Sequence, residues 1–187
     1  MTVSRRDFLL WGTAGSTALA LGSAWSQAPA NLGTAALPAQ GWRQFSLGSA
    51  EVFALNTIGP ALIAKHMLAL MPRGRPFLFA ALSARVGSIS DNRLGGWHSY
   101  RASKAALNML LRNFALEMAR THPEGVVVGL HPGTVDSALS QPFQTNLADG
   151  QLTAPAQAAD NLLGVLARLG PAQSGRVFDF RGEEIPA

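Results

Sequence analysis

Two residues that could move a proton, Tyr100 and Lys104, lie four positions apart in a segment with helical periodicity. Side chains four residues apart lie on one face of a helix, so a phenol and an ammonium can be presented to the same point. A free phenol has a pKa near ~10 and exchanges protons poorly at neutral pH. A cation held within about 4–6 Å lowers that pKa. The spacing therefore predicts a general acid–base pair that acts on a carbonyl oxygen or a hydroxyl.

The composition makes this pair unusual. Tyr100 is the only tyrosine of the 187 residues, and Lys104 is one of only two lysines, because almost all the other basic residues are arginine. Taken alone, the spacing is also compatible with a tyrosine and a lysine on the solvated face of an amphipathic helix. Neighbouring motifs are needed to decide between these two interpretations.

The overall composition predicts one packed domain, since 48% of the residues are hydrophobic and 14% are charged. The absence of cysteine excludes disulfides and thiolate metal sites. The four histidines show no close ligand spacing, which argues against a zinc site. The net charge is +4, but the arginines are scattered and no aromatic platform accompanies them. We therefore expect no nucleic-acid partner and no metal.

Residues 1–30 resemble a twin-arginine export signal. Arg5 and Arg6 precede Phe8 and a mildly apolar run rich in glycine, alanine and serine. Such a signal implies a periplasmic location and only transient contact with the membrane, whereas a protein that is not exported would stay cytoplasmic. A membrane anchor or an ordinary helix is the alternative, and the small polar residues disfavour both. We interpret residues 31–50 as a linker.

Residues 51–187 alternate between helical and extended patterns. Buried strands are predicted from two apolar runs, one at residues 77–82 and one at residues 126–130. Each connection is long enough to place parallel strands side by side. The sequence therefore predicts an α/β fold with a parallel sheet, in which helices at 51–71, 97–122 and 153–169 alternate with strands at 77–82, 126–130 and 176–180.

Four motifs occur in a fixed order along this segment. Asn-Thr-Ile-Gly-Pro occupies residues 56–60, Ser-Ala-Arg-Val-Gly-Ser occupies 83–88, Tyr-Arg-Ala-Ser-Lys occupies 100–104, and His-Pro-Gly-Thr-Val occupies 131–135. Together they resemble the short-chain dehydrogenase/reductase family, in particular its branch of C-factor and Sniffer-like carbonyl reductases. The resemblance runs from about Phe53 to the C-terminus and implies a Rossmann-like fold of three layers.

The resemblance implies a role for each matching residue. Tyr100 would be the general acid–base for carbonyl/alcohol interconversion, and Lys104 would lower its pKa and hydrogen-bond the nicotinamide ribose. Asn56 would hold a water molecule of the proton relay. The cofactor would be NAD(P)(H), with NADP(H) preferred, and the substrate a small carbonyl compound or alcohol. The turn that approaches the nicotinamide would consist of Pro132, Gly133, Val135 and Ser137.

One position departs from the family pattern. The substrate-orienting serine of the family lies three residues before the glycine matched by Gly87, where this chain has Ala84. Ser83 and Ser88 flank this position, and either could replace the missing serine. Consecutive residues of a strand point to opposite faces, so Ser83 is not an automatic substitute.

The glycine-rich strand–turn–helix that seats the dinucleotide in this family is not found before residue 51. We therefore expect residues 51–187 to be a truncated domain, the C-terminal half of the fold, with the outer edge of the 77–82 strand open to another chain. The alternative to an enzyme is a non-catalytic remnant, either without function or acting as an interaction module. As a module it would form a homo-oligomer or pair with a related chain through the helices at 51–71 and 97–122.

Overall fold

The computed structural model describes residues 8–11, 47–138, 140–141, 144, 147 and 150–187. The export signal and the linker predicted for residues 1–50 therefore lie outside the described residues, apart from residues 8–11 and 47–50. None of the helices within the described ranges combines the length and the apolar character needed to cross a membrane.

A five-stranded sheet runs through the described part of the chain in the order β1-β2-β3-β6-β7. The first four strands are parallel and β7 is antiparallel to β6. The strands are β1 (Phe8–Trp11), β2 (Phe77–Leu82), β3 (Gly125–His131), β6 (Val177–Asp179) and β7 (Glu184–Ile185). A separate pair of short parallel strands consists of β4 (Thr134–Val135) and β5 (Leu152–Thr153). The predicted α/β class with a parallel sheet is confirmed.

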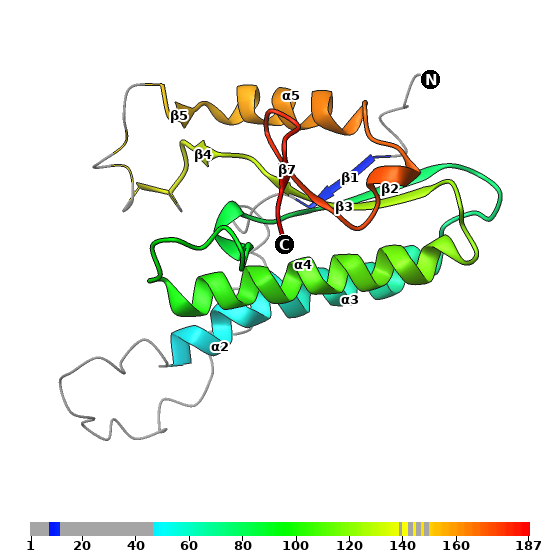
Figure 1. The fold of residues 1–187 in the computed structure, drawn as a ribbon, viewed down its shortest axis with the longest axis horizontal. Helices are drawn as coiled ribbons and strands as arrows, with labels where there is room; N and C mark the ends of the chain where they lie inside the picture. Colours follow the sequence, from blue (N-terminus) through cyan, green and yellow to red (C-terminus); the bar gives the residue numbers. More distant parts are fainter. Residues whose placement is uncertain (1–7, 12–46, 139, 142–143, 145–146, 148–149) are drawn as a thin grey trace.

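The helices form two outer layers (Figure 1). One face of the sheet is covered by α2 (Leu47–Phe53), the π-helical turn η3 (Ala54–Ile58), α3 (Gly59–Leu68) and α4 (His98–Ala119). The other face is covered by α5 (Pro155–Leu166). Two single 3₁₀ turns, η4 (Arg85–Gly87) and η6 (Pro171–Gln173), lie in the connections after β2 and α5.

Alternation of side chains along β2 and β3 produces two cores, one on each face of the sheet. Phe79 and Val127 pack with Leu107 and Leu111 of α4. Residues one position along each strand point the other way and pack against α5, and these are Ala80, Val126, Val128 and Leu130 with Leu162 and Val165. Both strands read as continuous apolar runs because helices cover both faces.

The structure corrects one prediction about the sheet. We expected the outer edge of the 77–82 strand to be open, but β1 pairs with it in parallel register, with Leu9 opposite Phe79. The apolar run Phe8–Trp11, which belongs to the predicted signal, can satisfy the backbone groups of that edge.

Parallel strands bring their carboxyl ends to one edge of the sheet, and α4 begins beside this edge (Figure 1).

Candidate active site

Tyr100 and Lys104 lie in the first two turns of α4 and face one another. The Nζ atom of Lys104 is 5.9 Å from the centroid of the Tyr100 ring. It donates a 2.9 Å hydrogen bond to the carbonyl oxygen of Leu82, the last residue of β2. Lys104 is only 7% exposed, whereas Tyr100 is 37% exposed. The helix therefore brings the two groups together, as their spacing predicts, and fixes the ammonium at the carboxyl edge of the sheet.

The protonation of this pair differs from the sequence expectation. Burial lowers the pKa of Lys104 to about 8 because the ammonium loses water. Burial also raises the pKa of the Tyr100 phenol, although the side chain keeps contact with solvent. The expected lowering of the Tyr100 pKa by Lys104 is thus absent from this structure, since desolvation of the phenolate dominates. Near neutral pH the phenol is protonated and can act as a proton donor.

The loop after β2 packs directly on α4 at Lys104. A Cβ atom at Gly87 would lie 2.8 Å from the backbone carbonyl carbon of Lys104 and 2.8 Å from its Cβ. Real Cβ atoms do not approach backbone that closely, so only glycine lets η4 reach the helix here. Gly87 thus determines how close the loop after β2 comes to Lys104.

We expect Gly87→Ala to lower the free energy of unfolding by about 1–3 kcal/mol, because the added methyl group pushes η4 away from α4. Urea unfolding followed by circular dichroism measures this loss. Gly164→Ala is the matched control, since a Cβ at Gly164 in α5 meets nothing within 4 Å. Alanine in a helix should stabilise the control by about 0.5–1 kcal/mol. Equal stabilities for the two variants would contradict the close approach at Gly87.

Both serines that flank Ala84 are hydrogen-bonded within the protein. The buried hydroxyl of Ser83 donates to Oδ1 of Asn108 in α4 at 2.5 Å. The Oγ of Ser88, also buried, accepts a 3.1 Å hydrogen bond from the backbone N–H of Asp91. Ser83 therefore points toward α4, on the side of the sheet that carries Tyr100 and Lys104, whereas Ser88 closes its own loop.

Asn56 lies in the π-helical turn η3, where it is half-buried. Its neighbour Thr57 donates a 2.8 Å hydrogen bond to the carbonyl oxygen of Ser103, the residue before Lys104. Single π-helical turns inside α-helices are frequent at functional sites. The structure thus places the element of Asn56 against α4, the helix of Tyr100 and Lys104, and the π-helical turn itself had no signal in the sequence.

The predicted nicotinamide-binding turn follows β3 at the same edge of the sheet. Gly133 has a φ of 76°, in the left-handed region, and a Cβ there would lie 3.1 Å from the Phe180 ring. Pro132, Val135 and Ser137 are half-buried around it. The backbone N–H of Ser137 donates to Oγ of Ser140 at 3.3 Å. The turn is therefore ordered by its own contacts and lies next to the end of β3.

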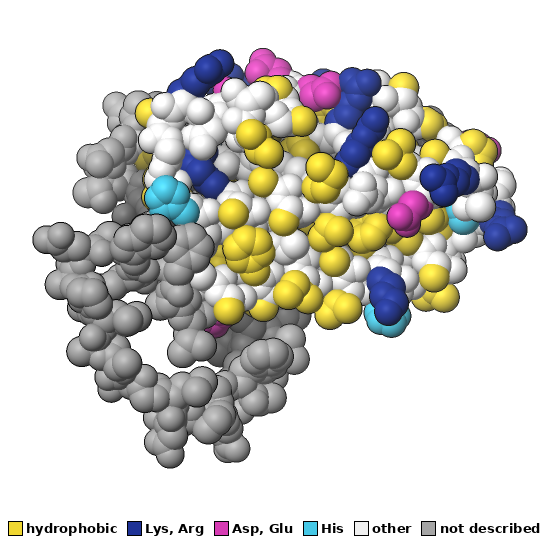
Figure 2. All heavy atoms as spheres, turned by 60° about the horizontal axis from the view of Figure 1, so that its bottom comes forward, with side chains coloured by type: hydrophobic (Ala, Val, Ile, Leu, Met, Phe, Trp, Pro, Cys, Tyr) yellow, Lys and Arg dark blue, Asp and Glu magenta, His cyan; other side chains and the backbone are white. Residues whose placement is uncertain are grey.

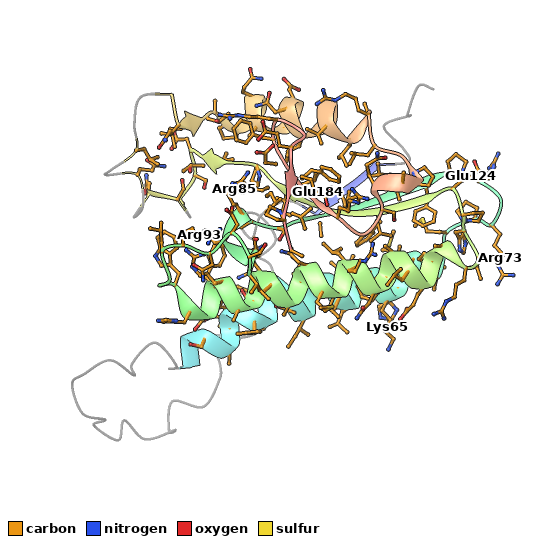
Figure 3. All side chains as sticks on the ribbon, in the orientation of Figure 1. Lys65, Arg73, Arg85, Arg93, Glu124 and Glu184 are labelled. Atoms are coloured by element: carbon orange, nitrogen blue, oxygen red, sulfur yellow. The ribbon has the colours of Figure 1, made fainter. Side chains whose placement is uncertain are left out.

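Three residues at this edge were missed by the sequence analysis. Arg85 makes ion pairs with Asp91 at 3.0 Å and with the buried Asp179 at 3.2 Å, and Figure 3 shows it at the end of β2. His131 lies opposite Asp179 in the sheet. Among the described residues, its buried Nδ1 atom has no hydrogen-bond partner. Burial, together with the nearby charges of Arg85 and Lys104 and against the opposing charge of Asp179, lowers the pKa of His131 to about 4, so the ring is neutral near pH 7.

This arrangement is an α/β sheet with a Tyr–Lys pair at the carboxyl ends of its parallel strands. A family model of the short chain dehydrogenases matches residues 42–148. The C-signal protein of Myxococcus xanthus is 38% identical over 138 residues, which cover 73% of this chain and 77% of that protein. The chain belongs to the short-chain dehydrogenase family, as its motifs predicted.

Two solved carbonyl reductases share the fold. The NADPH-bound carbonyl reductase from chicken fatty liver has a TM-score of 0.65 and 27% identity, and the match covers 80% of this chain and 62% of that one. Carbonyl reductase Sniffer of D. melanogaster has a TM-score of 0.66 and 23% identity, and the match covers 84% of this chain and 64% of that one. At this low identity the similarity supports the fold alone. This chain thus spans less than two thirds of the length of either structure.

Proposed function

We propose that the chain is an NAD(P)-dependent oxidoreductase that interconverts small carbonyl compounds and alcohols, with Tyr100 as the general acid–base. The observation that carries this proposal is the buried ammonium of Lys104, held beside the Tyr100 ring at the carboxyl edge of the sheet. Open α/β sheets bind their ligands outside this edge. Membership of the short-chain dehydrogenase family supports the same chemistry.

In the direction of reduction, a bound nicotinamide would supply a hydride to the carbonyl carbon. Tyr100 would give its phenolic proton to the carbonyl oxygen as charge develops there. The Lys104 ammonium would stabilise the phenolate that remains. Asn56 would hold a water molecule through which the proton is replaced. Ser83 would orient the carbonyl only after exchanging its hydrogen bond to Asn108.

The residues at this edge fit the nicotinamide end of the cofactor. The left-handed Gly133 keeps the turn after β3 free of a side chain, and the buried Nδ1 of His131 beside it lacks a partner among the described residues. Lys104 would contact the ribose, and the turn of Pro132, Gly133, Val135 and Ser137 would contact the ring. The NADPH bound to the similar chicken carbonyl reductase supports a preference for NADP(H).

The test is a titration of the purified full-length chain with NADPH, followed by turnover with a panel of small aldehydes and ketones. We expect a change in NADPH fluorescence on binding and a carbonyl-dependent loss of its absorbance. A fluorescence signal that stays unchanged at millimolar NADPH, together with no turnover, would overturn the proposal.

A second candidate function is an interaction module, and one observation favours it. Apolar side chains are exposed along η3, α3 and α4, and Figure 2 shows them gathered on the face formed by these helices. They are Leu55, Ile58, Leu62, Met109 and Leu116, each about half exposed. Apolar patches of this kind mark protein–protein contacts. The occupant we propose is a second copy of this chain, or a related chain with the same helices.

Light scattering tests this surface. We expect a dimer for the unmodified chain and a monomer for Leu62→Glu, because a charge in the centre of an apolar interface is left without water. Leu163→Glu is the control, since Leu163 is 42% exposed on α5 at the opposite face, and it should stay dimeric. A monomeric unmodified chain that also captures no related reductase in a pull-down would overturn the module.

A further inference from the structure

The turn that leads into α4 contains a strained residue. Trp97, at the N-cap of α4, has φ 46° and ψ 41°, and it is the one non-glycine residue with positive φ in the described ranges. A bulky side chain disfavours this left-handed conformation, in which Cβ crowds the following carbonyl oxygen. Such strain persists only where surrounding contacts hold it, and it concentrates at functional sites. Gly95 and Gly96 before it also have positive φ, so three consecutive residues of this turn are left-handed.

The side chain of Arg101 contacts this turn at several points, in addition to the hydrogen bond from the Gly95 N–H to Oδ1 of Asn92 at 2.9 Å. Its Nε atom donates to the carbonyl oxygens of Gly95 at 3.0 Å and Gly96 at 3.1 Å. Its NH1 atom donates to the carbonyl oxygen of Val86 in η4 at 3.3 Å. Its guanidinium carbon lies 5.5 Å from the centroid of the Trp97 ring. One side chain thus joins the strained turn, the loop after β2 and the helix.

Both members of the Tyr100–Lys104 pair lie on α4, and the turn and the η4 loop pack beside them. Tyr100 directly precedes Arg101 in the first turn of α4, so the entry angle of the helix determines where its hydroxyl lies. The same η4 loop touches Lys104 through Gly87. A planar fork with several N–H groups can bind carbonyls of two segments at once, which a lysine ammonium cannot do with the same geometry.

We propose that Arg101 is a positioning residue of the reductase site: by holding the left-handed turn at Trp97 against η4, it fixes the Tyr100 hydroxyl relative to Lys104 and the end of β2. This inference rests on the proposed function. It differs from an ordinary contribution to stability, because the loss of Arg101 should displace Tyr100 even in a folded protein.

The test compares Arg101→Gln with Arg101→Lys in the full-length chain. We expect Arg101→Gln to lower kcat at least about tenfold, while KM for NADPH changes less than about twofold, since misplacement of a reacting group affects the chemical step. Arg101→Lys should recover only part of kcat. Adding Trp97→Gly to Arg101→Gln should raise kcat at least about threefold, because glycine adopts the left-handed conformation without strain. Arg120→Gln, at the C-cap of α4, is the control and should behave as the unmodified chain.

A readout without turnover separates this inference from the proposed function. Tyr100 is the only tyrosine, so the ultraviolet titration of phenolate reports on it alone. In Arg101→Gln the raised pKa of Tyr100 should move down toward the ordinary value for tyrosine as the residue gains water. An unchanged titration and kcat, with only a lower melting temperature, would overturn the positioning role. If adding Trp97→Gly to Arg101→Gln fails to raise kcat, the positioning role of Arg101 is overturned as well. Absence of turnover in the unmodified chain would instead remove the proposed function.

Discussion

Tyr100→Phe is expected to abolish carbonyl reduction, with kcat lowered by about 10²–10⁴-fold, the usual contribution of a positioned acid–base group. The substitution removes only the hydroxyl, so the ring still packs beside Lys104 and the fold is retained. Because the pKa of Tyr100 is raised in this structure, the phenol holds its proton at neutral pH, and the substitution removes that proton donor. Steady-state kinetics with NADPH and a carbonyl substrate measure the effect.

NADPH affinity is the internal control for this variant. If Tyr100 moves only a proton, the fluorescence titration of Tyr100→Phe with NADPH should match that of the unmodified chain within about twofold. A variant that keeps more than about a tenth of kcat would show that another group supplies the proton. Equal losses of cofactor binding and turnover would indicate a structural role for the hydroxyl.

Lys104→Met is expected to separate activity from stability. Lys104 is 7% exposed, and its ammonium donates a hydrogen bond to the carbonyl oxygen of Leu82 and lies beside the Tyr100 ring. Methionine fills nearly the same volume and removes a desolvated charge, while the carbonyl of Leu82 loses a partner at a cost of about 1 kcal/mol. The free energy of unfolding should therefore change by no more than about 1 kcal/mol. Turnover should fall by about 10²-fold, because no cation then stabilises the Tyr100 phenolate.

Lys65→Met is the matched control, since the second lysine of the chain extends from the exposed side of α3 (Figure 3). Its turnover should stay unchanged, and its free energy of unfolding should change by no more than a few tenths of a kcal/mol. Equal activity of the two variants would contradict the role of Lys104. A large loss of stability in Lys104→Met alone would show that the ammonium is chiefly structural.

The lowered pKa of Lys104 predicts how activity and stability change with pH. Its pKa in the folded chain is about 8, below the ordinary value of 10.5. If the ammonium is required, activity falls as the pH rises through about 8, and this limb disappears in Lys104→Met. Between about pH 8 and 10.5 the unfolded state binds more protons than the folded state, so this group makes stability rise with pH in that window. Urea unfolding across the window should show a smaller rise for Lys104→Met.

Much of the architecture follows from local patterns. The continuous apolar runs of β2 and β3 are typical of parallel strands that are buried on both faces by helices. The structure shows both strands, with helices packed on each face of the sheet. The amphipathic periodicity predicts the long helix at 97–122, observed as α4 at His98–Ala119. The strand β1 and the short antiparallel β7 were not predicted. Strands this short carry little periodic signal, and pairing with a distant partner decides whether they form.

By itself, the sequence determined which residues could do chemistry. The spacing of Tyr100 and Lys104 and the glycine of the Pro132-Gly133 turn are local properties, since helix geometry and backbone conformation depend on neighbouring residues. Only the tertiary structure decided the burial, the hydrogen bonding and the pKa shifts of Tyr100 and Lys104. The hydrogen bonds from Lys104 to the carbonyl of Leu82 and from Arg101 to the carbonyl of Val86 join different elements of the fold. Burial, which raises the Tyr100 pKa, is likewise a sum over distant segments that no local pattern encodes.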